Sequence, residues 1–117
     1  MAEIAKLCGP DFDIYSGNDD QVVALMSLGA KGVISVVANI APKMVHDMCV
    51  EYLQGNTGKS LEMQLNLLDL CKACFIELNP IPAKEALEIM GYGKAVFRSP
   101  MCNMDDSNRE ILRSTLK

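Results

Sequence analysis

Polar residues that could bind a ligand follow a short predicted strand near the start of the chain. Gly17, Asn18 and Asp19 stand between a strand predicted at residues 12–16 and the helix that comes next. In α/β proteins, ligands bind at the carboxyl ends of parallel strands, where such loops lie. The same residues also suit a tight turn and a capping box, with Asn18 as the cap and Gln21 three residues later. The local sequence therefore leaves a binding loop and a helix start both open.

Two other features could carry chemistry, and both favour a structural interpretation. A Cys-x-x-Cys motif spans residues 71–74, but no second Cys or His pair stands at the spacing of a zinc site. Its cysteines fall on the apolar arc of a helix, which favours core packing. His46 is the only histidine and lies off the apolar face of its helix, which favours a solvated side chain. We therefore predict no metal site and no cofactor.

The composition narrows the class of protein. The chain has 117 residues, enough for one domain or a piece of one. Fifteen acidic against eleven basic residues give a net charge of −4, which argues against nucleic-acid binding. We find no signal peptide and no apolar run near the ~20 residues of a membrane span, so no membrane partner is expected. Five cysteines, an odd number, favour reduced thiols in a cytoplasmic protein.

The elements that must position these residues begin with a strand, a helix and a second strand. The helix is predicted after Asn18 and ends at Gly29. The second strand is predicted at residues 32–37, a nearly continuous β-branched run typical of a parallel strand covered on both faces. Two such strands do not make a stable sheet alone, because their faces and edges need neighbours. The chain thus resembles the last part of a larger α/β protein.

Helices are predicted for the rest of the chain. They cover residues 43–53, 60–78 and 82–90, and a last helix opens at Asp105 or Ser107. Pro82 suits the first turn of its helix. The apolar arc of the helix predicted at 60–78 is wide, which indicates burial on two sides, partly by another subunit.

Four segments taken together resemble one enzyme family. They are Tyr-Ser-Gly-Asn-Asp-Asp at 15–20, Gly-Val-Ile-Ser-Val at 32–36, Asn-Pro-Ile-Pro-Ala-Lys at 79–84 and Arg-Ser-Pro-Met at 98–101. In sequence, order and spacing they resemble the C-terminal portion of dihydrodipicolinate synthase (4-hydroxy-tetrahydrodipicolinate synthase). The related N-acetylneuraminate lyases differ at the first two segments, so they are the second family that the sequence resembles.

The resemblance implies an α/β fold: the last two βα units of a (β/α)8 TIM barrel plus a C-terminal helical extension. Residues 1–54 would supply strands seven and eight with their helices, and residues 55–117 the extension. In the family, a lysine forms a Schiff base with pyruvate, and the enamine attacks aspartate semialdehyde on the route to lysine and diaminopimelate. That lysine and a tyrosine–threonine proton relay would precede Met1, so we expect this chain alone to be an inactive part of a lyase.

The resemblance also implies site residues and partners. Ile34 matches the position whose backbone carbonyl contacts pyruvate, Gly17 the glycine that lines the pocket, and Asn18 and Asp19 the pair that borders the second-substrate pocket. Lys84 is not expected to be the nucleophile, because Leu87 stands where the family motif would continue with a hydroxyl residue and glycine. The expected partners are the missing N-terminal part of the barrel and the other subunits of a homotetramer. The alternative is a non-catalytic fragment that acts as an assembly or interaction module.

Overall fold

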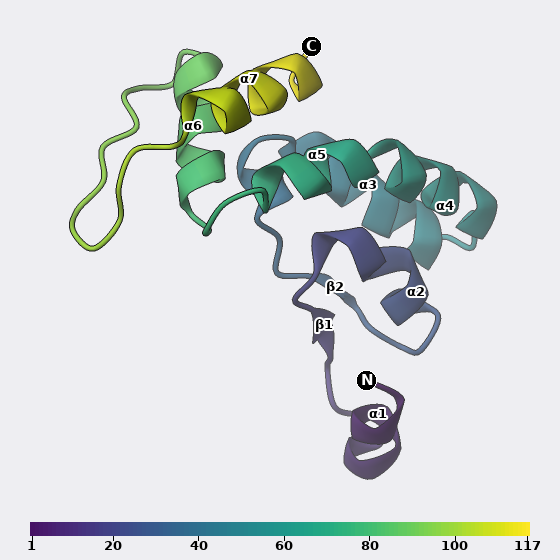
Figure 1. Cartoon of the computed structure of the whole chain (residues 1–117). Helices are drawn as coiled ribbons and strands as arrows, with labels where there is room; N and C mark the ends of the chain where they lie inside the picture. Colours follow the sequence, from purple (N-terminus) through teal and green to yellow (C-terminus); the bar gives the residue numbers. More distant parts are fainter. The chain divides into compact units, whose positions relative to one another are not determined.

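The structure, a computed structural model, describes residues 1–117 and divides into two compact units (Figure 1). The N-terminal unit covers residues 1–67 and the C-terminal unit residues 68–117. The N-terminal unit contains α1 (Ala2–Cys8), β1 (Tyr15–Ser16), the 3-10 helix η1 (Asp19–Gln21), α2 (Val22–Met26), β2 (Gly32–Val33), the 3-10 helix η2 (Val37–Asn39), α3 (Pro42–Leu53) and α4 (Thr57–Asn66). The C-terminal unit contains α5 (Leu68–Cys74), α6 (Ile81–Ile89) and α7 (Asp106–Thr115).

The two predicted strands form a parallel pair, but both are shorter than predicted. Tyr15 lies opposite Gly32 and Ser16 opposite Val33, and these are the only strand residues. The predictions of strands over 12–16 and 32–37 are therefore wrong at their outer parts. Each strand has one neighbour, and after residue 34 the chain turns into η2, with Val36 already in a helical conformation (φ −76°, ψ −43°). A buried-strand composition gives an extended strand only where partners flank it.

The helix after β1 begins differently from the prediction. Asn18 makes no side-chain cap hydrogen bond, so the predicted capping box with Gln21 is wrong. A single 3-10 turn, η1, leads into α2 instead. At the other end α2 stops at Met26 with Ser27 as its C-cap, so the prediction that the helix runs to Gly29 is wrong by three residues. Gly29 ends the turn that follows and adopts φ 97°, the left-handed conformation that favours glycine.

Apolar side chains from α2, η2, α3 and α4 make the core of the N-terminal unit. The buried members are Val22, Val23, Met26, Val37, Ile40, Val45, Met48 and Leu67. Ser60 of α4 is also buried, and its hydroxyl donates a hydrogen bond to the carbonyl of Met48 on α3 (2.8 Å). Helix α1 stands apart from this core in Figure 1 and contributes no buried residue.

The predicted helix over 60–78 is interrupted at Leu67. The chain forms α4 up to Asn66 and α5 from Leu68, and α5 ends at Cys74. The amide of Leu67 is shared by the carbonyls of Met63 and Gln64, both at 3.2 Å, the tightened geometry common at helix ends. The prediction of one continuous helix is therefore wrong. The spacing of apolar residues is nearly the same with or without an interruption of one residue, so it could not reveal this break.

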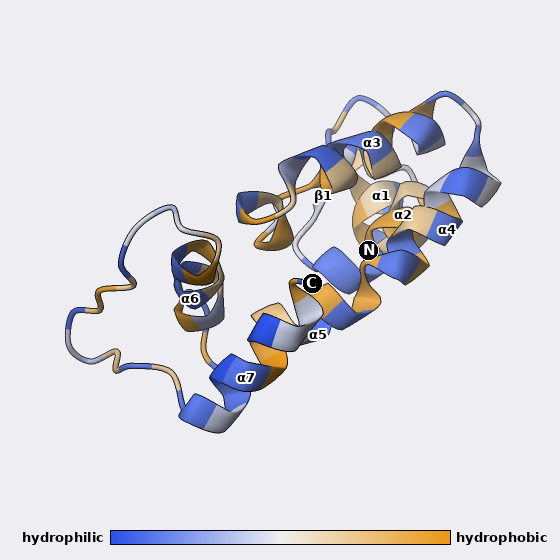
Figure 2. Cartoon of the chain, turned by 90° about the horizontal axis from the view of Figure 1, so that it is seen from above, coloured by the Kyte–Doolittle hydropathy of each residue, from blue (hydrophilic) through white to orange (hydrophobic).

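Three helices build the C-terminal unit. Pro82 lies in the first turn of α6, as predicted. Asp105 caps α7 by accepting a hydrogen bond from the amide of Ser107 (2.9 Å), which confirms it as the helix start. Hydrogen bonds from the Ser107 hydroxyl and amide lower the pKa of Asp105. Helix α7 is mostly hydrophilic in Figure 2, and its Leu112 is fully buried.

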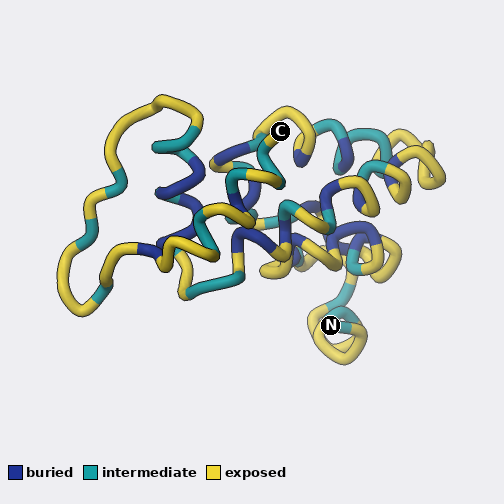
Figure 3. Tube along the Cα trace, turned by 45° about the horizontal axis from the view of Figure 1, so that its top comes forward, coloured by how far each residue is buried: buried dark blue, intermediate teal, exposed yellow.

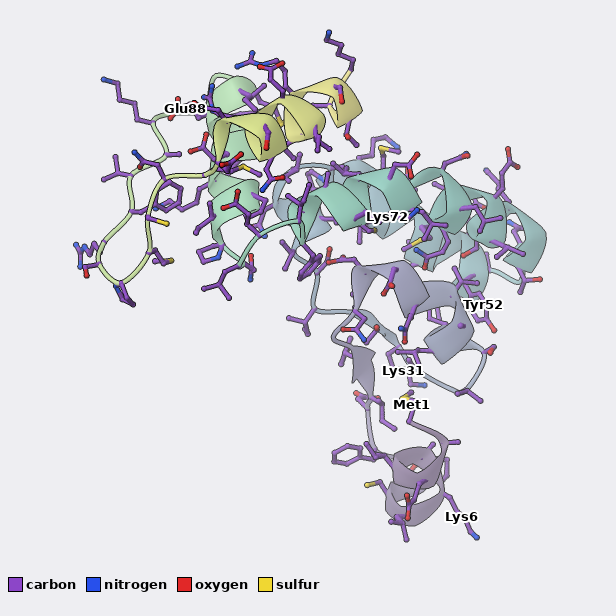
Figure 4. All side chains as sticks on the ribbon, viewed as in Figure 1. Met1, Lys6, Lys31, Tyr52, Lys72 and Glu88 are labelled. Atoms are coloured by element: carbon purple, nitrogen blue, oxygen red, sulfur yellow. The ribbon has the colours of Figure 1, made fainter.

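A long loop joins α6 to α7 and runs mostly exposed (Figure 3). Two side chains of α6 hold its first half. The ammonium of Lys84 donates a hydrogen bond to the carbonyl of Val96, and the carboxylate of Glu88 accepts one from the amide of Ala95 (2.6 Å). Glu88 is labelled in Figure 4, at the start of this loop. The loop is therefore fixed by helix side chains and not by a strand partner.

Candidate active-site edge

The carboxyl ends of β1 and β2 lie at the same edge of the parallel pair. Backbone hydrogen bonds extend the pairing by one residue on each side: Lys31 donates to Ile14 (2.8 Å) and Ile34 to Ser16 (2.9 Å). Gly17 follows β1 directly, and Ile34 follows β2 directly. The fold thus brings together the two segments from which the sequence predicted site residues.

A local turn shapes the loop after β1. The buried hydroxyl of Ser16 donates to the carbonyl of Asn18 (2.8 Å) and accepts from its amide (3.1 Å). Gly17 and Asn18 are exposed, and a Cβ on Gly17 would meet no atom within 4 Å. Both residues therefore remain available at the edge, and this chain leaves free space beside Gly17.

Asp19 behaves differently from its two neighbours, because its side chain is buried and turned toward the loop after β2. One carboxylate oxygen accepts a hydrogen bond from the hydroxyl of Ser35. The other accepts from the amides of Val36 (2.9 Å) and Val37 (3.4 Å). The carboxylate is thus fully engaged by the chain that follows Ile34.

Sequence reasoning missed Ser35 and Gln64. Ser35 also accepts a hydrogen bond from the amide of Ala38 (2.8 Å). Gln64 is buried on α4, and its side-chain amide donates to the carbonyl of Asp19 (2.9 Å) and accepts from the amide of Val23 (3.2 Å). A glutamine between the apolar positions of a helix was the available signal, but its partners lie more than 40 residues earlier in the chain.

The other residues with possible chemistry lie away from this edge or are engaged. His46 is exposed on α3, and hydrogen bonds from Lys43 and His46 lower the pKa of Asp47 beside it. Burial raises the pKa of the Cys49 thiol, which makes it a poor nucleophile. Both cysteines of the Cys-x-x-Cys motif are buried on α5. Lys84 is bound to its loop, with its ammonium 5.0 Å from the centre of the Phe97 ring.

No group of three or more His, Cys, Asp or Glu side chains is placed to hold a metal ion. None of the helices has the length and apolar character needed to cross a membrane. The groups that this edge offers to a ligand are the backbone amides and carbonyls around residues 17 and 34 and the exposed side chain of Asn18.

Comparison with known proteins decides which family this edge represents. The family model of the dihydrodipicolinate synthetase family matches residues 1–117, the whole of the chain. The chain belongs to the dihydrodipicolinate synthetase family. This confirms the family that the four sequence segments resemble.

Relatives in the dihydrodipicolinate synthetase family are similar over the full length of the chain. The 4-hydroxy-tetrahydrodipicolinate synthase of Clostridium tetani is 54% identical over 116 residues, which are 99% of this chain and 40% of that protein. Synthase 1 of Clostridium acetobutylicum is 50% identical over 117 residues, again 40% of its length. The chain therefore spans about 40% of the length of these relatives.

Solved structures agree. The dihydrodipicolinate synthase of Aquifex aeolicus matches with a TM-score of 0.95 at 40% identity, over 98% of this chain and 39% of that one. The enzyme of Thermotoga maritima matches with a TM-score of 0.93 at 43% identity, over 97% of this chain and 39% of that one. The chain thus has the local structure of the corresponding part of TIM-barrel enzymes.

Proposed function

We propose that this chain forms the C-terminal part of a lyase that condenses pyruvate with aspartate semialdehyde, in the biosynthesis of diaminopimelate and lysine. The observation that carries the proposal is the family match over all 117 residues. In this proposal, residues 1–54 are the last two βα units of a (β/α)8 barrel and residues 55–117 are its helical extension. The complete barrel works in the cytoplasm as a homotetramer.

The proposed roles follow from the edge of the β1–β2 pair. The carbonyl of Ile34 contacts bound pyruvate, and Gly17 lines the pocket without a side chain that would crowd it. Asn18 and Asp19 border the pocket of the second substrate. A carbonyl oxygen accepts hydrogen bonds and repels carboxylates, so it suits the protonated nitrogen of a Schiff base better than the acid group of pyruvate. The nucleophilic lysine comes from the rest of the barrel.

A chimaera tests the proposal directly. In it, this chain replaces the segment that it matches in the Clostridium tetani synthase. We expect the chimaera to consume pyruvate and aspartate semialdehyde together. Borohydride with pyruvate should trap an adduct on a lysine of the Clostridium part, and Lys84→Gln should leave this adduct unchanged.

The isolated chain is the matched comparison. With pyruvate and borohydride it should stay unmodified, because none of its lysines lies in the family's Schiff-base segment. An adduct on Lys84 or another lysine of the isolated chain would contradict the proposal that the nucleophilic lysine comes from the rest of the barrel. A folded chimaera without any condensing activity would contradict the function, and would favour a module that acts only in assembly.

A further inference from the structure

The Ile34 carbonyl has two anchors, one on each side of it in the chain. On the amino side, the amide of Ile34 itself donates to the carbonyl of Ser16 at 2.9 Å, which continues the sheet. On the carboxyl side, the carboxylate of Asp19 accepts hydrogen bonds from the hydroxyl of Ser35 and the amides of Val36 and Val37. The peptide group that joins Ile34 to Ser35 therefore lies between two fixed points.

Asp19 is suited to hold this segment in one orientation. Its side chain is only 4% exposed, and both its oxygens accept hydrogen bonds from residues 35–37. Its own main chain is fixed in turn, because Gln64 donates to its carbonyl at 2.9 Å. Hydrogen bonds from N–H and O–H donors to a carboxylate are stronger than those between neutral groups, so the contact fixes both loops together.

We propose that Asp19 is a positioning residue: its carboxylate sets the direction of the Ile34 carbonyl that the proposed function assigns to pyruvate. This inference rests on the proposed function and deepens it. Asp19 then borders the second-substrate pocket with its main chain, while its side chain acts on the first substrate through Ile34.

The competing role is direct binding of the second substrate by the Asp19 carboxylate. Burial and three donors from the same chain argue against it, because a substrate would have to displace contacts already made. Asp20, the next residue, is exposed and supplies the matched control. It carries the same charge beside the same loop, and its side chain makes no hydrogen bond to residues 35–37.

The test uses the chimaera with Asp19→Asn, Ser35→Ala, their combination, and Asp20→Asn as control. Asparagine keeps the size of the side chain but offers one acceptor where two are used. We expect the pyruvate KM to rise about tenfold in Asp19→Asn. This corresponds to about 1.4 kcal/mol, roughly the contribution of one charge-assisted hydrogen bond. The KM for aspartate semialdehyde should change less than about twofold, and Asp20→Asn should match the unsubstituted chimaera.

Two further measurements separate positioning from a merely structural effect. Ser35→Ala should also raise the pyruvate KM, but by a smaller factor. In the double variant the increase in KM should be less than the product of the two single increases, because both substitutions break the same contact between Ser35 and Asp19. Amide exchange at Val36 and Val37 should become faster in Asp19→Asn while the rest of the chimaera keeps its protection. Ser35→Ala removes a single hydroxyl, so it keeps the test valid if Asp19→Asn does not fold.

The outcomes are distinct. A raised KM for aspartate semialdehyde with unchanged pyruvate kinetics would overturn the positioning role in favour of direct binding. Unchanged kinetics for both substrates in Asp19→Asn would also overturn it, while leaving the proposed function intact. An unsubstituted chimaera that folds but traps no pyruvate would overturn the proposed function, and the role of Asp19 toward pyruvate with it.

Discussion

The guanidinium of Arg109 on α7 donates a hydrogen bond of 2.7 Å to the carboxylate of Glu85 on α6. The Glu85 side chain is only 8% exposed, and the same guanidinium reaches Glu88 at 3.0 Å. The hydrogen bond that Arg109 donates to Glu85 and the charges of both glutamates raise the pKa of Arg109. One cation thus neutralises a buried acid and links two helices of the C-terminal unit.

Arg109→Met should therefore destabilise the C-terminal unit. It leaves the buried carboxylate of Glu85 without its cation, which costs about 1–3 kcal/mol. Faster amide exchange in α7 of the chimaera would measure this loss. Arg113→Met is the matched control, because its partner Glu110 is exposed and such pairs contribute less than about 1 kcal/mol. Equal effects of the two substitutions would contradict the importance of the buried acid.

Gly17→Val tests the proposed pocket lining. A Cβ at this position meets no atom of this chain within 4 Å, so the local backbone accepts a side chain, and we expect the substituted chimaera to fold as the unsubstituted one does. Its KM for pyruvate or aspartate semialdehyde should rise, or its turnover fall, because the added side chain enters space proposed for substrate. Steady-state kinetics and a circular dichroism melt measure both quantities. Unchanged kinetics would remove Gly17 from the site.

The isolated chain should associate with itself or bind hydrophobic dyes. Each strand of the β1–β2 pair has one free edge, and large apolar side chains are exposed in both units. They include Phe12, Tyr15, Ile34, Leu61, Leu65, Phe75 and Leu78. Exposed apolar patches and open strand edges promote association. Sedimentation velocity checks this, and a monodisperse monomer with protected amides at residues 34–37 would contradict it.

The cap of α7 should weaken in acid. The pKa of Asp105 lies below its usual value of 3.8, so its carboxylate contributes stability above that value and loses it as the pH falls through the lowered pKa. The amide resonance of Ser107, followed by NMR, should therefore move with a midpoint below pH 3.8. Asp105→Asn also caps helices but does not titrate, so its profile should stay flat over this range. A midpoint at or above the usual value would contradict the hydrogen bonds as the cause.

Features encoded by neighbouring residues could be predicted from the sequence, and features set by distant partners could not. Pro82 in a first turn and Asp105 as a cap depend on a few adjacent residues, and both predictions are confirmed. The strand predicted to Val37 ends early because β2 has one neighbouring strand and because Asp19, from another segment, accepts hydrogen bonds from the amides of residues 36 and 37 in the turn that follows. The composition of residues 32–37 contains no trace of that contact.

The candidate site divides in the same way. The family resemblance pointed to Gly17, Asn18, Asp19 and Ile34, and the structure brings their segments to one edge. Their substrate contacts remain predictions. The inward direction of the Asp19 side chain could not be derived, because it depends on Ser35 and on the side-chain amide of Gln64, which holds the Asp19 carbonyl.

The contact between Gln64 and Asp19 also sets an order of events during synthesis. The two residues are 45 positions apart, so at 5–20 residues per second Gln64 is added about 2–9 s after Asp19. The loop after β1 is therefore synthesised seconds before the side chain that fixes its main chain exists. Until Gln64 has been added and α4 has folded against this loop, the Asp19 carbonyl and the Val23 amide lack the partner that they share in the folded chain.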